Sequence, residues 1–127
     1  MSSKKPSQGV DTLHKQALKL LLSYAVTAKQ AADYDWSNSG LGRRVAELNR
    51  FIKRDLAELK VELDNMTVRH RRVITSAVLN NPSHPTMLKC GGDYYNYFDR
   101  VNSIVSPHTG ELMDLIAQKA AMEKVQA

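Results

Sequence analysis

In this 127-residue sequence, the side chains whose type and spacing most clearly indicate a binding function are arginine and lysine. Between residues 43 and 72, nine basic residues outnumber five acidic ones, so most of the formal net charge of +5 lies in this segment. Such side chains bind the phosphate oxygens of nucleic acids without reading the base sequence. The segment, with its densest run RHRR at 69–72, therefore predicts a phosphate-binding surface. The alternative is a solvated helix face with ion pairs between residues three or four apart.

Histidine and cysteine are the other candidates for chemistry, and their spacing predicts neither a metal site nor a nucleophile. The four histidines and the single cysteine do not form two ligand pairs at zinc spacing, since only His84 and Cys90 lie near each other. No glycine-rich phosphate loop is present, and nothing supplies a base and an oxyanion site for Cys90. We therefore expect a protein without catalysis, metal or other cofactor.

Composition indicates a globular protein with an acidic partner. The chain is 43% hydrophobic and 24% charged, and its pI is about 9.4, which favours nucleic acid as that partner. The longest apolar stretch, residues 17–28, is interrupted by Lys19 and is too short to span a bilayer. No signal peptide is visible, and a lone cysteine fits a reducing compartment. We expect a cytoplasmic or virion-packaged protein without a membrane partner.

Helical periodicity along the chain predicts an all-α fold. Residues 1–10 read as a flexible basic arm and residues 11–127 as a single helical domain. Asp11 is a plausible cap for a first helix, which either runs unbroken to about Asp33 or pauses near Val26. A cluster of Asp, Ser, Asn and Gly at 35–42 predicts a loop.

A long helix is expected over residues 41–79, and it ends before NNPSHP at 80–85. A helix of this length either bends back near residues 65–67 or packs against a partner chain. Its inward positions are predicted to be Val45, Leu48, Ile52, Leu56, Leu59, Leu63, Met66, Val73 and Ala77.

The C-terminal third predicts a pair of helices over residues 93–125. CGG at 90–92 reads as a break, Asp93 as the cap of one helix, and Ser106 with Pro107 as the start of another. The aromatic residues at 94–98 are predicted to pack in the core, with stacking on unpaired bases as the alternative.

Residues 27–48 have the local features of two helices joined by a tight turn. Thr27 with Gln30 forms a capping box, and Ala31 supplies a small residue where helices cross closely. Asp35 would occupy a turn position with positive φ, and Ser37 would cap the second helix. Three apolar residues at steps of four and three would then face inward: Leu41, Val45 and Leu48.

This pattern resembles the helix-turn-helix of bacterial and phage DNA-binding proteins, with Asp35 where glycine is usual and Gln30 where an apolar residue is common. The resemblance implies that four residues face base edges in the major groove: Asn38, Ser39, Gly42 and Arg43. It implies that three others contact phosphates: Thr27, Lys29 and Arg44. The alternative is one helix from Asp11 to Asp33, a loop, and a long helix with a solvated basic face.

These observations predict an all-α helical bundle with one long central helix and a helix-turn-helix at 27–48. The predicted function is non-catalytic binding of double-stranded DNA, favoured over RNA, by a homo-oligomer or larger assembly. Terminase small subunits and small regulators of phage and mobile elements share this general plan. The predicted nucleic-acid-binding residues are Lys29, Asn38, Ser39, Arg43, Arg44, Arg50, Arg69, Arg71 and Arg72.

Two other functions stay open at the level of sequence. One is a helical structural subunit of a virion or nucleoprotein complex, making non-specific contacts with nucleic acid or with an acidic protein. The other is a small inhibitor that occupies the nucleic-acid site of another protein.

Overall fold

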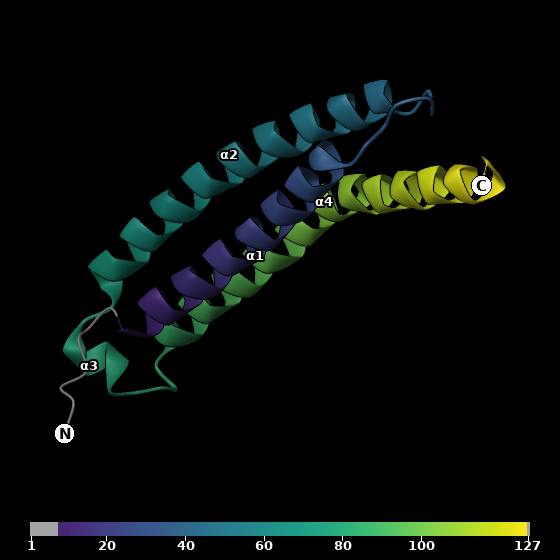
Figure 1. Cartoon of the computed structure of the whole chain (residues 1–127). Helices are drawn as coiled ribbons and strands as arrows, with labels where there is room; N and C mark the ends of the chain where they lie inside the picture. Colours follow the sequence, from purple (N-terminus) through teal and green to yellow (C-terminus); the bar gives the residue numbers. More distant parts are fainter. Residues whose placement is uncertain (1–7, 127) are drawn as a thin grey trace.

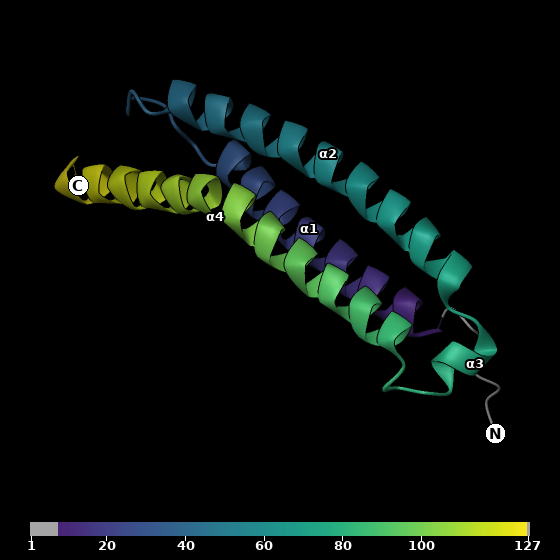
Figure 2. The same cartoon turned by 180° about the vertical axis from the view of Figure 1, so that it is seen from behind.

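Four helices make up the computed structural model, which describes residues 8–126. They are α1 (Gln8–Asp33), α2 (Gly42–Val73), α3 (Ser76–Leu79) and α4 (Pro85–Gln126). The three long helices lie side by side, with α2 antiparallel to α1 and α4 antiparallel to α2 (Figures 1 and 2). Residues 8–126 contain no strand, so the predicted all-α class is confirmed.

Helix α1 is continuous through Val26, where the sequence also allowed a pause. Thr27 lies inside it and donates from its hydroxyl to the carbonyl of Ser23 at 3.1 Å, so it does not cap a second helix. The helix starts three residues before Asp11, because Val10 belongs to the buried core. The predicted arm is therefore too long by residues 8–10, and its remaining residues, 1–7, lie outside the described part of the chain.

The connection between α1 and α2 is a loop packed around Trp36. The indole Nε1 donates to the carbonyl of Ala31 at 2.7 Å, and the small buried Ala31 side chain leaves room for this contact. Asp35 does not have positive φ, in contrast to the prediction; that backbone geometry occurs at Asn38 (φ 60°) and Gly40 (φ 72°). The Asp35 carboxylate instead accepts from the backbone and hydroxyl of Ser37, which stabilises the turn.

Helix α2 begins after Leu41, which makes no side-chain capping hydrogen bond, so the predicted cap at Ser37 is wrong. Its inner face is buried along the whole helix, at Val45, Leu48, Ile52, Leu59, Leu63, Met66, Thr67 and His70. The helix does not bend back near residues 65–67, and α1 and α4 of the same chain are long enough to cover its inner face (Figure 2).

The long helix ends at Val73, six residues before the predicted boundary. Ile74 adopts an extended backbone (ψ 97°) and its side chain is buried, whereas Val73 is half exposed. Thr75 then accepts a hydrogen bond from the backbone of Val78 and caps the single turn of α3. Three consecutive β-branched residues, which have lower helix propensity, favour a break at this point.

The predicted C-terminal pair is wrong, because α4 is one helix through Gly91, Gly92 and Pro107. An interior glycine costs a helix about 1 kcal/mol and an interior proline about 3 kcal/mol. A continuous apolar stripe offsets these costs by burying Cys90, Tyr94, Tyr97, Val101, Val105, Leu112 and Leu115. The helix changes direction along its second half (Figure 1), as expected for a helix with an internal proline.

The tyrosines of α4 pack against α2. Tyr97 donates to the carbonyl of Leu59 at 2.7 Å, and the hydroxyls of Tyr94 and Thr67 lie 2.7 Å apart. Both rings are buried, so the predicted packing role is confirmed for them. Tyr95 differs, since 67% of it is exposed.

Candidate nucleic-acid interface

The outer face of α2 carries cations that the protein leaves without carboxylate partners. Arg43 and Arg50 lie two helical turns apart, on the side of α2 opposite the buried residues. Five exposed basic residues of α2 make no ion pair within residues 8–126: Arg43, Arg50, Lys53, Arg69 and Arg72. Their charges are therefore available to an anionic partner.

Two of the predicted binding residues are instead engaged in contacts between helices. Arg44 donates to both carboxylate oxygens of Glu111 on α4, at 2.5 and 2.8 Å, and also pairs with Glu47. The guanidinium lowers the pKa of Glu111, and the hydrogen bonds that Arg44 donates to Glu111 and Glu47 raise the pKa of Arg44. Arg71 donates twice to Asp11 on α1, at 2.7 and 3.0 Å. Both arginines join helices rather than face a ligand.

Most acidic residues of α2 are likewise used inside the protein. Asp64 accepts from Lys60 at 2.6 Å, and this hydrogen bond is the main reason that its pKa lies below the ordinary value. Glu62 pairs with Arg100 of α4 at 3.1 Å. Asp55 pairs with Arg54, and Glu47 with Arg44. Of the five acidic residues of α2, only the exposed Glu58 makes no ion pair within residues 8–126, and it lies between the two groups of unpaired arginines.

The residues predicted to read bases do not share a helix face. Asn38 and Ser39 lie in the loop before α2, so they cannot project from α2 beside Arg43. The Ser39 hydroxyl donates to the carbonyl of Trp36 at 2.6 Å and accepts from the backbone of Leu41 at 3.1 Å. Lys29, which was predicted to contact phosphate, is on α1, where it pairs with Asp33 at 2.9 Å.

The unpaired arginines form two pairs at opposite ends of α2 rather than a compact site, Arg43 with Arg50 and Arg69 with Arg72, with Arg69 lying 19 residues after Arg50. Arg43 and Arg72 are separated by 29 residues of one helix, which corresponds to about 44 Å. Helix α1 is long and unbroken. Helices α1 and α4 pack along the inner face of α2. The short, protruding recognition helix implied by residues 27–48 is therefore absent, because α2 packs along its full length.

Lys53 is a cation of α2 that makes no ion pair within residues 8–126 and that the predicted site omitted. It follows Arg50 at three residues, a spacing that places both on neighbouring positions of the helix surface and could have identified it. No local spacing in the sequence could have indicated the pairing of Arg44 with Glu111, because 67 residues separate the two side chains.

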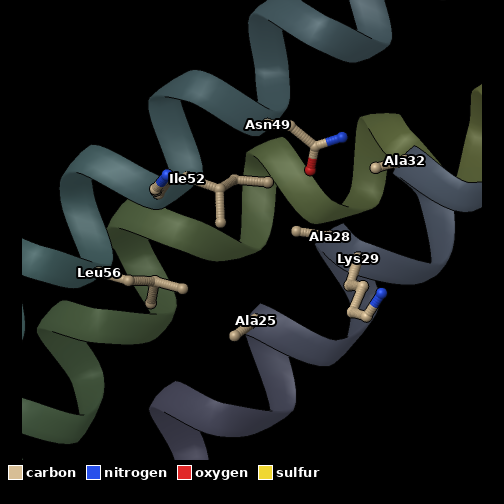
Figure 3. A pocket seen from close by; sticks show the side chains of 8 residues that line it. Ala25, Ala28, Lys29, Ala32, Asn49, Ile52 and Leu56 are labelled. Atoms are coloured by element: carbon tan, nitrogen blue, oxygen red, sulfur yellow. The ribbon is translucent and has the colours of Figure 1, made fainter.

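A second surface feature lies between α1 and α2. An apolar groove of about 380 Å³ is lined by Ala25, Ala28, Ala32, Ile52 and Leu56, together with Lys29, Asn49 and Lys53. Figure 3 shows that the alanines of α1 lie opposite the larger side chains of α2. The hollow exists because small residues on α1 leave space beside α2. Leu22 and Val26 extend the exposed apolar surface of α1.

The side chains within residues 8–126 offer no cluster of three His, Cys, Asp or Glu residues suited to a metal ion. None of the helices in this range combines the length and apolar character needed to cross a bilayer. Burial raises the pKa of the Cys90 thiol, which opposes its use as a nucleophile.

Comparison with known proteins identifies no relative of this chain. No family model, curated protein or solved structure matches the chain.

Proposed function

We propose that the protein is a non-catalytic nucleic-acid-binding protein that contacts the phosphate backbone through the outer face of α2. The observation that carries this proposal is the set of exposed arginines on α2 that pair with no carboxylate among residues 8–126, namely Arg43, Arg50, Arg69 and Arg72. An isolated surface cation needs no explanation, but two pairs of exposed arginines without carboxylate partners on one helix favour a polyanion.

The geometry favours phosphate contacts over base readout. Arginines spread over about 44 Å of one packed helix can contact separate phosphates, whereas base readout needs a few side chains inserted into a groove. Only the outer surface of α2 is available for this, because its inner face is packed against α1 and α4. We propose double-stranded DNA as the partner and expect the protein where nucleic acid occurs, in the cytoplasm or a virion.

The double variant Arg43→Gln/Arg50→Gln tests this proposal. We expect it to weaken binding to a random DNA duplex by on the order of tenfold at 0.1 M salt. We also expect the slope of log K against log salt to fall by about two, one for each lost phosphate contact. Fluorescence anisotropy with labelled duplex across a salt series measures both quantities.

The matched control is Lys15→Gln/Lys19→Gln, which removes the same charge from exposed positions on α1. If both double variants lose affinity equally, net charge alone explains binding and the α2 face has no special role. Absence of binding by the unaltered protein at low salt would reject the nucleic-acid function itself. A strong preference for one duplex sequence would instead favour base readout.

The groove between α1 and α2 favours a second candidate, a structural subunit of a helical assembly. Its alanine-rich wall allows another helix to approach closely, and its rim carries Lys29 and Lys53. Within residues 8–126, Lys53 has no carboxylate partner. The occupant that fits this chemistry is an amphipathic helix of a partner protein, with an apolar stripe flanked by glutamate or aspartate.

A helical peptide display library with randomised flanking positions tests this candidate. We expect the unaltered protein to enrich acidic flanks and the Lys53→Glu variant to enrich basic flanks, because the rim charge selects the partner. The same flank composition for both proteins would contradict the candidate. Light scattering provides the complementary measurement: a dimer that the groove substitution Ala25→Glu dissociates would assign the groove to a second copy of this chain.

A further inference from the structure

We infer that the outer face of residues 113–125 of α4 binds the same face of a second copy of this chain, with the two helices antiparallel. The end of α4 projects past the other helices (Figures 1 and 2). Every residue from Ala121 to Val125 is exposed, so nothing within residues 8–126 covers this part of the helix. Most of the stability of a helix in water comes from packing of one face, so a free helical end favours a partner. This inference does not depend on the proposed binding of DNA.

Large apolar side chains are exposed along this end of α4. Met113 is 56% exposed, Met122 is 37% exposed and Val125 is 87% exposed. A hollow of about 440 Å³ lies on the same segment, lined by Gln118, Ala121, Met122 and Val125. Single exposed apolar residues are normal on a protein surface, but several on one helical segment beside a hollow are typical of a contact surface.

Four exposed residues of this segment follow one another at steps of three, four and three, which places them in one row along α4: Asp114, Ala117, Ala121 and Lys124. The opposite side of the same segment is buried, at Leu112 and Leu115. The row therefore points away from the core, with a small apolar centre, an acidic residue at one end and a basic residue at the other. Small side chains at the centre allow a second helix to approach closely.

The two charged residues of this row are not engaged inside the described part of the chain. Within residues 8–126, neither Asp114 nor Lys124 forms an ion pair. The neighbouring acids of α4 are engaged, since Glu111 pairs with α2 and Glu123 pairs with Lys119. Asp114 and Lys124 are ten residues apart on one helix, about 15 Å, which is too far for them to pair with each other. Their charges stay available to a second molecule.

The row is complementary to itself only in the antiparallel direction. Asp114 lies five residues before position 119 and Lys124 five residues after it, while Ala117 and Ala121 lie two residues before and after it. Two antiparallel copies centred on this position place Asp114 of each copy beside Lys124 of the other, and Ala117 beside Ala121. A parallel pair would place each charge against its own kind, which electrostatic repulsion opposes. The occupant that fits this face is therefore a second copy of the chain.

Charge reversal tests this inference. We expect the unaltered protein to change from monomer to dimer over a hundredfold range of protein concentration, as measured by sedimentation velocity. Lys124→Asp should raise the dissociation constant of the dimer by roughly tenfold or more, because the dimer contains the altered contact twice. Asp114→Lys should have the same effect. Both positions are exposed, so both variants should fold, which circular dichroism verifies.

Restored complementarity provides the second part of the test. The double variant Asp114→Lys/Lys124→Asp again has opposite charges at the two ends of the row and should dimerise like the unaltered protein. An equimolar mixture of the two single variants should also form a dimer, with one copy of each. The matched control is Lys89→Asp, which reverses the charge of an exposed lysine at the other end of α4 and should leave the dissociation constant unchanged.

A protein that stays monomeric at every concentration would overturn the inference. A dimer that Lys124→Asp leaves intact would also overturn it, and dissociation of that dimer by Ala25→Glu would assign the contact to the groove between α1 and α2. Equal weakening by Lys89→Asp would show that net charge, and not this face, controls association. Arg43→Gln/Arg50→Gln should leave the dimer intact, so failure of the proposed DNA binding is distinguishable from failure of this inference.

Discussion

Leu63→Ala is expected to lower the free energy of unfolding by about 3–5 kcal/mol, the largest effect of any single substitution considered for this protein. Leu63 is fully buried in the middle of α2, on the face covered by α1 and α4. Its truncation removes apolar contacts and leaves a cavity that long, packed helices cannot readily close. Urea unfolding followed by circular dichroism measures this change.

The concentration dependence of the Leu63→Ala experiment tests whether the chain folds alone or only together with a second chain. If the chain covers its own long helix, the loss of stability should be the same over a hundredfold range of protein concentration. A loss that grows on dilution would show that folding of the chain is coupled to its association with a second chain. Leu88→Ala is the matched control, since Leu88 is 64% exposed and its truncation should change stability by less than about 0.5 kcal/mol.

Stability is expected to fall steeply above about pH 10, because two tyrosines of α4 resist ionisation in the folded state. Burial raises the pKa of Tyr97 and also that of Tyr94 above the ordinary value of 10. Below that pH both tyrosines are protonated in the folded and unfolded states, so they contribute no pH dependence. Above it, the unfolded chain releases protons that the folded chain retains, which favours unfolding by about 1.4 kcal/mol per pH unit for each tyrosine.

Tyr97→Phe isolates this effect. We expect the variant to lose about 1 kcal/mol at pH 8, because the hydrogen bond to the carbonyl of Leu59 is missing. We also expect its stability to fall less steeply than that of the unaltered protein between pH 10 and 12. Tyr95→Phe is the control, since Tyr95 lies in solvent and its removal should leave the slope unchanged. Parallel slopes for all three proteins in thermal unfolding would contradict the assignment to Tyr97.

Local patterns in the sequence were sufficient for the helical class and for much of the buried face of α2. Val45, Leu48, Ile52, Leu59 and Leu63 were predicted to face inward and do so. The loop after α1 and the break before α4 were also expected from their Asp, Ser, Asn, Gly and Pro residues. These features follow from spacing and turn chemistry over a few residues, which a single sequence contains.

The extent of the helices depended on tertiary packing. Gly91, Gly92 and Pro107 were read as boundaries from their local preferences, but α4 continues through all three. The stripe from Tyr94 to Leu112 keeps helical spacing across Pro107, so its burial outweighs the local cost. Conversely, the predicted helix over 41–79 ends at Val73, because Ile74 enters the core only with an extended backbone.

Which cations remain available for a ligand was decided by tertiary structure alone. Arg43 and Arg44 are neighbours in the sequence, yet Arg44 reaches Glu111 on α4 while Arg43 pairs with no carboxylate among residues 8–126. Arg71 and Arg72 differ in the same way, because only Arg71 reaches Asp11 on α1. Spacing along a chain specifies which residues share a helix face. The register in which two helices pack specifies which charges meet, and that register depends on contacts between residues far apart in the sequence.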